Sequence, residues 1–138
     1  MTQLITDAGF VQEHWAAGFT PLGEAANDVR ALDVNADADP ASLPLTPELI
    51  RIAFPSSADG RGFTIARTLR LRGYGGRLRA YGPVLADQYA MARRSGFDEV
   101  EIPDDLAARQ PEAQWLFRAD WQQHNYQARL RGSAHPQL

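Results

Sequence analysis

The 138-residue chain has 14 basic and 17 acidic residues, a formal net charge of −3, and 44% hydrophobic residues. This length suits a single domain with its own core, and the composition argues against wholesale disorder. The negative charge argues against a general nucleic-acid binder. Because there is no cysteine, disulfides, thiolate nucleophiles and cysteine-bound metal sites are excluded.

All 14 basic residues are arginines. Without lysine, Schiff-base chemistry and the lysine of a phosphate-binding loop are also excluded. No apolar run approaches the roughly 20 residues that span a bilayer, and no basic region precedes an apolar one at the N-terminus. We therefore expect a cytoplasmic protein without membrane contact, built as one domain over residues 1–138.

The N-terminal residues 1–27 are expected to form a β and loop extension. Short apolar patches around Leu4 and Phe10 flank residues 6–9, whose Asp and Gly are typical of a tight turn. Residues 18–27 contain glycine and proline and are expected to form a connection.

Apolar runs predict a small sheet. They lie at residues 29–34, 48–54, 78–82 and 97–102. One helical pattern follows Gly62 and is stopped by Gly73 and Gly75-Gly76, and a second one ends at Ser95–Gly96. Strands and helices that alternate at these lengths favour parallel β-α-β units with right-handed crossovers. We expect an α/β fold with a mainly parallel sheet of about four strands, either open or forming part of a barrel.

Two helices carry specific expectations. The helix that ends at Gly96 is expected to bury Leu85, Gln88, Tyr89 and Ala92. A final helix is expected over residues 111–130, with an apolar stripe formed by Phe117, Trp121, His124 and Ala128. Residues 132–138 are expected to form a flexible tail.

Metal sites are not indicated by residue spacing. The aspartates at 33, 37 and 39 lack the central glycine and closing glutamate of an EF-hand loop. The histidines at 14, 124 and 135 lack ligand spacing. We expect no metal, and the residues do not identify a cofactor.

The turn Asp59-Gly60-Arg61-Gly62 is the most informative stretch. It separates a predicted strand from a predicted helix, whose N-terminus offers unpaired N–H groups and partial positive charge. Arg61 adds a full charge, so the turn favours an anion. The candidate anion-binding residues are Gly60, Arg61, Gly62 and Arg67. In the structural alternative, the glycines only form the turn, Asp59 caps the helix and Arg61 pairs with a carboxylate.

Further candidate residues lie at two other places. Asp87 follows the third predicted strand, and ligands of open parallel sheets bind beyond the carboxyl ends of strands. Asp59 and Asp87 are therefore candidate acid/base residues, with helix capping as the alternative for Asp87. On the final helix, Trp115 and Trp121 are candidates for a partner interface, with core packing as the alternative.

Residues 54–102 resemble a bacterial family of unknown function, DUF934. The resemblance is carried by Phe54-Pro55, Asp59-Gly60-Arg61-Gly62-Phe63, Ala66-Arg67, Leu69-Arg70, Arg79-Ala80, Gly82, Asp87-Gln88 and Gly96-Phe97-Asp98. Ser56-Ser57-Ala58 departs from the aromatic and threonine that commonly precede the glycine turn in this family. Members commonly lie beside genes for assimilatory sulfite reduction, and some carry a general oxidoreductase label. The resemblance implies a pathway but no cofactor or catalytic residue.

Two functions stay open at this point. The first is a cytoplasmic accessory protein of assimilatory sulfite reduction that binds a small oxyanion or an enzyme partner such as a sulfite reductase, with a homodimer also open. The second is a small enzyme acting on a phosphorylated or sulfur-containing metabolite. In that reading Asp59 or Asp87 is the acid/base group and Arg61 is the anion clamp.

Overall fold

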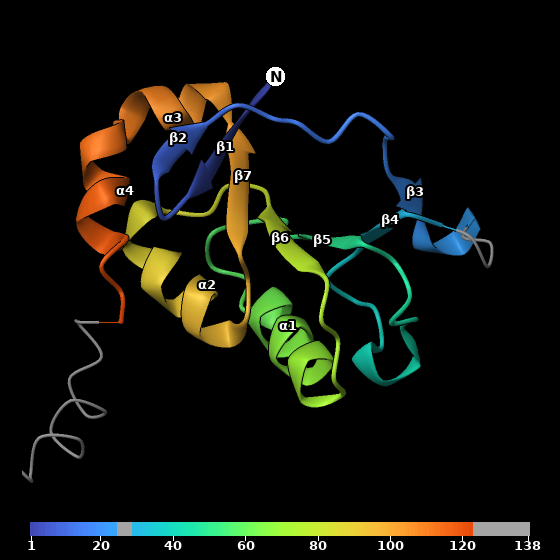
Figure 1. The fold of residues 1–138 in the computed structure, drawn as a ribbon. Helices are drawn as coiled ribbons and strands as arrows, with labels where there is room; N and C mark the ends of the chain where they lie inside the picture. The colour runs from blue at the N-terminus through green and yellow to red at the C-terminus, as the bar shows by residue number, and fades with distance from the viewer. Residues whose placement is uncertain (25–28, 123–138) are drawn as a thin grey trace, which may run out of the picture.

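Seven strands form one sheet in the computed structural model, which describes residues 1–24 and 29–122 (Figure 1). The strand order is β2-β1-β7-β6-β5-β4-β3. Strands β3 to β7 pair in parallel, and β1 pairs antiparallel with both β7 and β2. The bounds are β1 Thr2–Thr6, β2 Gly9–Val11, β3 Thr20–Pro21, β4 Ala31–Val34, β5 Leu49–Ala53, β6 Arg77–Tyr81 and β7 Glu99–Pro103.

Four α-helices occur in the described part of the chain: α1 Arg61–Leu71, α2 Tyr89–Ser95, α3 Asp104–Arg109 and α4 Glu112–Arg118. Short 3-10 turns cover Leu22–Glu24, Pro40–Ser42 and Ala86–Gln88. Helix α2 ends at Gly96, whose φ of 117° is the left-handed conformation expected of a C-terminal glycine. None of the helices that the structure describes is long or apolar enough to cross a membrane.

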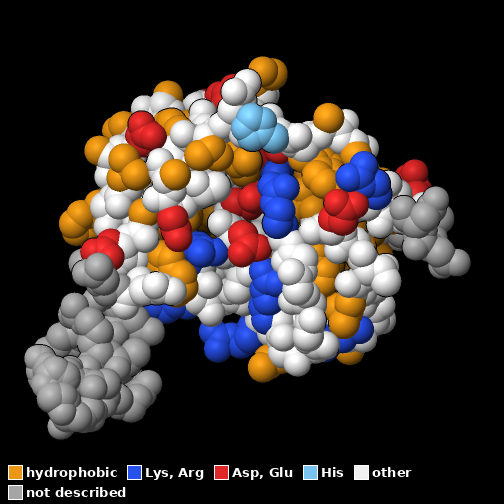
Figure 2. Space-filling model, viewed as in Figure 1, with side chains coloured by type: hydrophobic (Ala, Val, Ile, Leu, Met, Phe, Trp, Pro, Cys, Tyr) orange, Lys and Arg blue, Asp and Glu red, His pale blue; other side chains and the backbone are white. Residues whose placement is uncertain are grey.

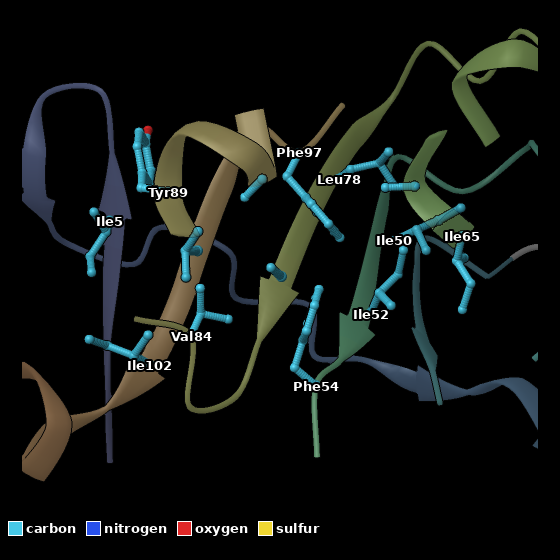
Figure 3. Close-up of a cluster of buried hydrophobic side chains, with 14 of the residues drawn as sticks. Ile5, Ile50, Ile52, Phe54, Ile65, Leu78, Val84, Tyr89, Phe97 and Ile102 are labelled. Carbon is cyan, nitrogen blue, oxygen red and sulfur yellow. The ribbon is translucent and has the colours of Figure 1, made fainter. Parts of the chain in front are cut away.

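One face of the sheet carries the hydrophobic core. Alternate residues of a strand point to the same face, and on this face the central strands carry only apolar side chains. Ile50, Leu78 and Val100 are fully buried there and belong to one cluster with Ile65 and Leu69 of α1. Figure 3 shows Ile50 and Leu78 of the sheet together with Ile65. Since neighbouring parallel strands follow one another in sequence, right-handed connections place α1 and α2 on this same side.

The opposite face of the sheet is charged. In β4 to β7 it carries Asp33, Arg51, Arg79, Glu99 and Glu101, which alternate with the core residues. Figure 2, drawn from the same side as Figure 1, shows acidic and basic side chains together near the middle of the molecule. Because β2 and β3 lie at opposite edges of the sheet, the chain between them must span its width (Figure 1).

We call residues 12–19, which make this crossing, the strap. The strap lies over the charged face, because Glu13 pairs with Arg79 of β6 and the ring of Phe19 lies over Arg51 of β5. The charged face is therefore covered by irregular chain, whereas the apolar face is covered by helices.

The structure confirms the α/β class and the mainly parallel sheet, but the sheet has more strands than the predicted four. All four predicted strands are present as β4 to β7, and the N-terminal β addition is the hairpin β1–β2. Strand β3 was missed because only two residues, Thr20 and Pro21, pair with β4.

Two helix predictions need correction. The final helix begins beside Pro111 as predicted but ends at Arg118, and α3, which precedes it, was not predicted. Phe117 is 66% exposed, so it does not belong to a buried stripe, and Leu85 is 37% exposed although we expected it inside. His124, Ala128 and the tail at 132–138 lie outside the described residues.

Candidate functional site

A cleft lies beyond the carboxyl ends of β4 and β5, where ligands of parallel sheets bind. It consists of two pockets, of about 420 and 230 Å³, that share Ala36, Asp37 and Arg61. The larger pocket also has Thr64 and Ile65 of α1 in its lining, while the smaller one reaches Ala53 at the end of β5. Arg61, at the first position of α1, therefore lies between two hollows.

Asp59 holds the Arg61 side chain. Its Oδ2 accepts a hydrogen bond from Nη2 at 2.6 Å, and its Oδ1 accepts from Nε at 3.1 Å and from the Arg61 backbone N–H at 3.0 Å. These hydrogen bonds lower the pKa of Asp59 to about 2, so the carboxylate is charged at neutral pH. Two features of the structural alternative are thus present: Asp59 bonds the first helical N–H group and pairs with Arg61.

The charges of the cleft limit what it can bind. The two pockets have one acidic residue, Asp37, and one arginine, Arg61, in their lining, and Arg61 is also paired with Asp59. A bare anion would meet Arg61 only after Asp59 has neutralised most of its charge. The bonds to Asp59 use Nε and Nη2, and Nη1 makes none of them. An oxyanion that binds Arg61 therefore does so against the negative charge of Asp37 and Asp59, which limits its affinity.

The other candidate residues of the turn have different surroundings. Gly62 is buried, and a Cβ at this position would lie 2.4 Å from Cζ of Phe54, so this glycine is needed for packing. A Cβ on Gly60 would meet nothing within 4 Å. Arg67 is exposed on α1 and does not line either pocket of the cleft.

Asp87 does not join this cleft. Its carboxylate, 79% exposed, accepts a hydrogen bond from Arg118 of α4. The segment around Asp87 is nevertheless linked to the chain before Asp59, because Nε2 of the adjacent Gln88 donates to the Ser57 carbonyl at 2.7 Å. The structure therefore brings Asp59 and Arg61 together but directs Asp87 toward α4.

The two candidate interface tryptophans differ in exposure. Trp115 is 1% exposed, stacks edge-on against Tyr89 with ring centroids 6.1 Å apart, and donates from Nε1 to the Gln110 carbonyl at 2.9 Å. Trp121 is half-buried, and Arg93 lies 5.0 Å from its ring centroid. Trp115 is thus a core residue that attaches α4 to α2.

The charged face contains a site that the sequence analysis missed. Arg79 is fully buried, and its Nε donates to Glu99 at 2.6 Å while Nη1 donates to Glu101 at 2.9 Å. The strap adds a third carboxylate: Glu13 accepts from Nη1 and, at 3.2 Å, from Nη2. Burial disfavours the charged guanidinium, but the bonds to these carboxylates outweigh it and raise the pKa of Arg79.

Arg51 forms the second centre of this face. Its Nε and Nη2 donate to the two carboxylate oxygens of Asp33 at 2.7 and 2.8 Å, and Nη1 donates to Glu101 at 3.1 Å. The guanidinium carbon lies 3.8 Å from the ring centroid of Phe19 and 4.3 Å from that of Tyr81. An arginine between two aromatic rings is held in place and weakly hydrated.

A sequence signal for this face existed. In the predicted strands at 48–54, 78–82 and 97–102, each of Arg51, Arg79 and Glu101 has an apolar residue on both sides. Period-two alternation predicts a second, polar sheet face. Reading the runs as nearly continuous apolar strands concealed it.

A further cavity of about 580 Å³ lies at the amino ends of β5, β6 and β7, opposite to the Arg61 cleft. Its lining includes Arg70, Arg77 and Arg93. Arg70 donates to the carbonyls of Gly96, Tyr74 and Gly76 at 3.0, 2.9 and 2.8 Å. These bonds satisfy backbone groups at chain ends and loops, so Arg70 is structural. Within residues 1–24 and 29–122 no group of three metal-binding side chains is present.

Comparison with known proteins adds one finding. A family model described as "Bacterial protein of unknown function (DUF934)" matches residues 28–136. The match covers most of the chain and confirms the resemblance seen in residues 54–102. No curated protein and no solved structure matches the chain.

Proposed function

Because this chain belongs to the DUF934 family of bacterial proteins of unknown function, we propose that it is a cytoplasmic accessory protein of assimilatory sulfite reduction. In this proposal it binds a small oxyanion in the cleft around Arg61. The pathway comes from the gene neighbourhood that is common in the family, and the ligand class comes from the cleft.

One observation carries the oxyanion assignment. Arg61 begins an 11-residue helix and lies between two pockets beyond the carboxyl ends of parallel strands. The position combines the partial positive charge of the helix N-terminus with a guanidinium that Asp59 orients. The pairing with Asp59 reduces the net attraction, so we expect a modest affinity that falls as salt rises.

The oxyanion assignment is tested by titrating the full chain with sulfite and with sulfate in a calorimeter. We expect Arg61→Ala to weaken binding at least about tenfold, because the cleft lining then keeps the Asp37 carboxylate and has no cation. Arg67→Ala is the matched control, since Arg67 is exposed on the same helix outside the cleft. Equal binding by the parent and Arg61→Ala would contradict the assignment.

Binding to an enzyme partner is a second candidate, favoured by the surface of α4. Leu116 and Phe117 of this helix are 44% and 66% exposed, and apolar side chains of this size are typical anchors of interfaces. In this candidate the buried Trp115 fixes the helix, and its neighbours contact the partner.

Purification of the tagged chain from its own host, followed by mass spectrometry, tests the partner candidate. Stoichiometric recovery of a sulfite reductase that Leu116→Ser abolishes would support it. Met91→Ser is the matched control, because Met91 is exposed on α2. Recovery of the chain alone would count against a stable partner.

The enzyme alternative has less support. With a pKa of about 2 and a bidentate bond to Arg61, Asp59 is a poor general base and no general acid at neutral pH. Asp87 lies outside the cleft, in contact with Arg118. We therefore place the accessory function first.

A further inference from the structure

We propose that the charged face of the sheet is a binding site for small organic carboxylates, occupied in this structure by the chain's own Glu13. An external carboxylate would take the place of the Glu13 side chain on Arg79 and release the strap. This site is separate from the Arg61 cleft, and the proposal does not depend on it.

The first support is the geometry at Arg79. Glu13 bonds to both terminal nitrogens of the guanidinium, which is the two-pronged arrangement that arginine offers to any carboxylate. Arg79 is 0% exposed, whereas the Glu13 side chain is 39% exposed and comes from an irregular segment. Arg79, which would bind the carboxylate, is thus fixed within the sheet, whereas Glu13 belongs to the partly exposed strap.

The second support is the charge count. Within the sheet, the carboxylates of Asp33, Glu99 and Glu101 bond to the guanidinium groups of Arg51, Arg77 and Arg79, so three negative charges meet three positive ones. Glu13 adds a fourth negative charge to a set that is already balanced. Neutralising Arg79 does not require it, so its place can be vacated without leaving an unpaired buried arginine.

The third support is how the strap is attached. Two of its hydrogen bonds are internal: the Trp15 N–H donates to Glu13 at 2.8 Å, and Nε1 of Trp15 donates to the Gly18 carbonyl at 2.8 Å. Its contacts with the sheet include Glu13 on Arg79 and Phe19 on Arg51. Losing the Glu13 contact would free the strap around Glu13, and the ring contacts of Trp15 with Arg30 and of Phe19 with Arg51 would be left to hold it.

The neighbourhood of Arg79 favours an organic carboxylate. Phe19 lies 5.5 Å from the Arg79 guanidinium carbon, and the Tyr81 ring stacks on the adjacent Arg51. A ligand that replaces the Glu13 carboxylate would place its apolar part beside the Phe19 ring. Acetate is the simplest probe, because Glu13→Ala removes a group of about that size and shape.

The first experiment compares acetate binding by the parent chain and by Glu13→Ala, using calorimetry and the shift in melting temperature. We expect acetate to bind Glu13→Ala at least about tenfold more tightly, because the tethered competitor is gone. Chloride at equal ionic strength should not raise its melting temperature. Glu24→Ala, which removes the same charge outside the site, should behave like the parent. Equal acetate affinity in parent and Glu13→Ala overturns the proposal.

The second experiment asks whether the strap opens in the parent chain. Trp15 lies on the strap with Arg30 5.0 Å from its ring centroid, so opening should change its fluorescence. We expect a saturable emission change with acetate in the parent and none in Trp15→Phe. If Glu13→Ala binds acetate but the parent shows no Trp15-dependent change, Glu13 is a fixed ion pair and the proposal fails.

A double variant separates this site from the Arg61 cleft. We expect Glu13→Ala combined with Arg61→Ala to bind acetate as well as Glu13→Ala alone does. Loss of acetate binding in the double variant would place the anion in the Arg61 cleft and overturn the assignment to the charged face. If Arg61→Ala loses sulfite binding while the double variant keeps acetate binding, the two sites are independent, which supports the assignment to the charged face.

Discussion

Gly62 illustrates how a residue that looks like part of a binding turn can be required for packing. The ring of Phe54 packs against the rings of Phe63 and Phe97, with centroid distances of 5.0 and 5.8 Å, and it approaches the α1 backbone at Gly62. Any Cβ at this position would collide with the ring, and the surrounding aromatic residues restrict its movement.

We expect Gly62→Ala to lower the free energy of unfolding by about 1–3 kcal/mol, the usual cost of overpacking a core. This should hold even though alanine favours a helix over glycine by roughly 1 kcal/mol. Urea unfolding measures the change. Gly75→Ala, where a Cβ meets nothing within 4 Å, is the control and should stay within about 0.5 kcal/mol of the parent. Equal loss in both variants would contradict the packing argument.

The pKa of Glu13 gives a second prediction for a single residue. Partial burial would raise this pKa, but the hydrogen bond from Arg79 outweighs it and the pKa lies below its ordinary value of 4.5. A carboxyl group with a lowered folded pKa stabilises the fold above its unfolded pKa, and this contribution disappears as the pH falls through the folded value.

We therefore expect Trp15 fluorescence to report loosening of the strap as the pH falls below about 4.5, the ordinary value. Glu13→Gln should remove this transition, because its amide does not titrate. Trp15→Phe identifies the part of the emission that belongs to the strap. A transition of the same size in Glu13→Gln would assign the titration to another group.

At the residue scale, the sequence identified the Asp59–Arg61 turn but not what surrounds it. The structural alternative had Arg61 pair with a carboxylate, and the structure identifies that carboxylate as Asp59. The roles of Gly60 and Gly62 could not be separated, because only the position of the distant Phe54 ring distinguishes them. The partners of Arg79 come from the strap and from β7, so no local pattern reveals them.

At the scale of elements, α4 depends on one side chain. Trp115 is its buried residue and contacts Tyr89 of α2. We expect Trp115→Ala to lower the free energy of unfolding by about 3–5 kcal/mol, as for other buried tryptophans. Phe117→Ala, on the exposed side of the same helix, should change it far less. Chemical denaturation measures both, and similar losses would show that Trp115 is not the anchor.

Strands were easier to predict than helices in this chain. Apolar runs with turn residues on both sides gave β4 to β7 close to their observed bounds. The final helix was extended too far because aromatic residues continue at helical spacing after Arg118, and periodicity alone does not mark where a helix ends. Helix α3 follows Pro103 directly, in a stretch for which no element was predicted.

At the scale of the whole molecule, the charged network joins the strap to strands β4 to β7. Replacing Arg79 with methionine would leave Glu99 and Glu101 buried with less positive charge beside them. We expect Arg79→Met to lower the free energy of unfolding by about 3–5 kcal/mol, the usual cost of removing one partner from buried ion pairs.

A double-mutant cycle then measures the coupling free energy between Glu13 of the strap and Arg79 of the charged network. Adding Glu13→Gln to Arg79→Met should recover part of the loss, because one unpaired carboxylate is removed. The Asp59→Asn and Arg79→Met pair is the control, since Asp59 bonds to Arg61 on another part of the molecule. Additive effects of Glu13→Gln and Arg79→Met would show that the strap is not coupled to the network.

The antiparallel pairing of β1 with β7 also sets the order in which the chain can fold during synthesis. Thr2 pairs with Pro103, so β1 finds its neighbour β7 only after the roughly hundred residues between them have been synthesised. Until β7 is made, the edge of β6 that pairs with β7 is open, and the hairpin β1–β2 has no neighbouring strand. Nascent chains that stop before residue 99 should therefore be the ones that chaperones bind most strongly.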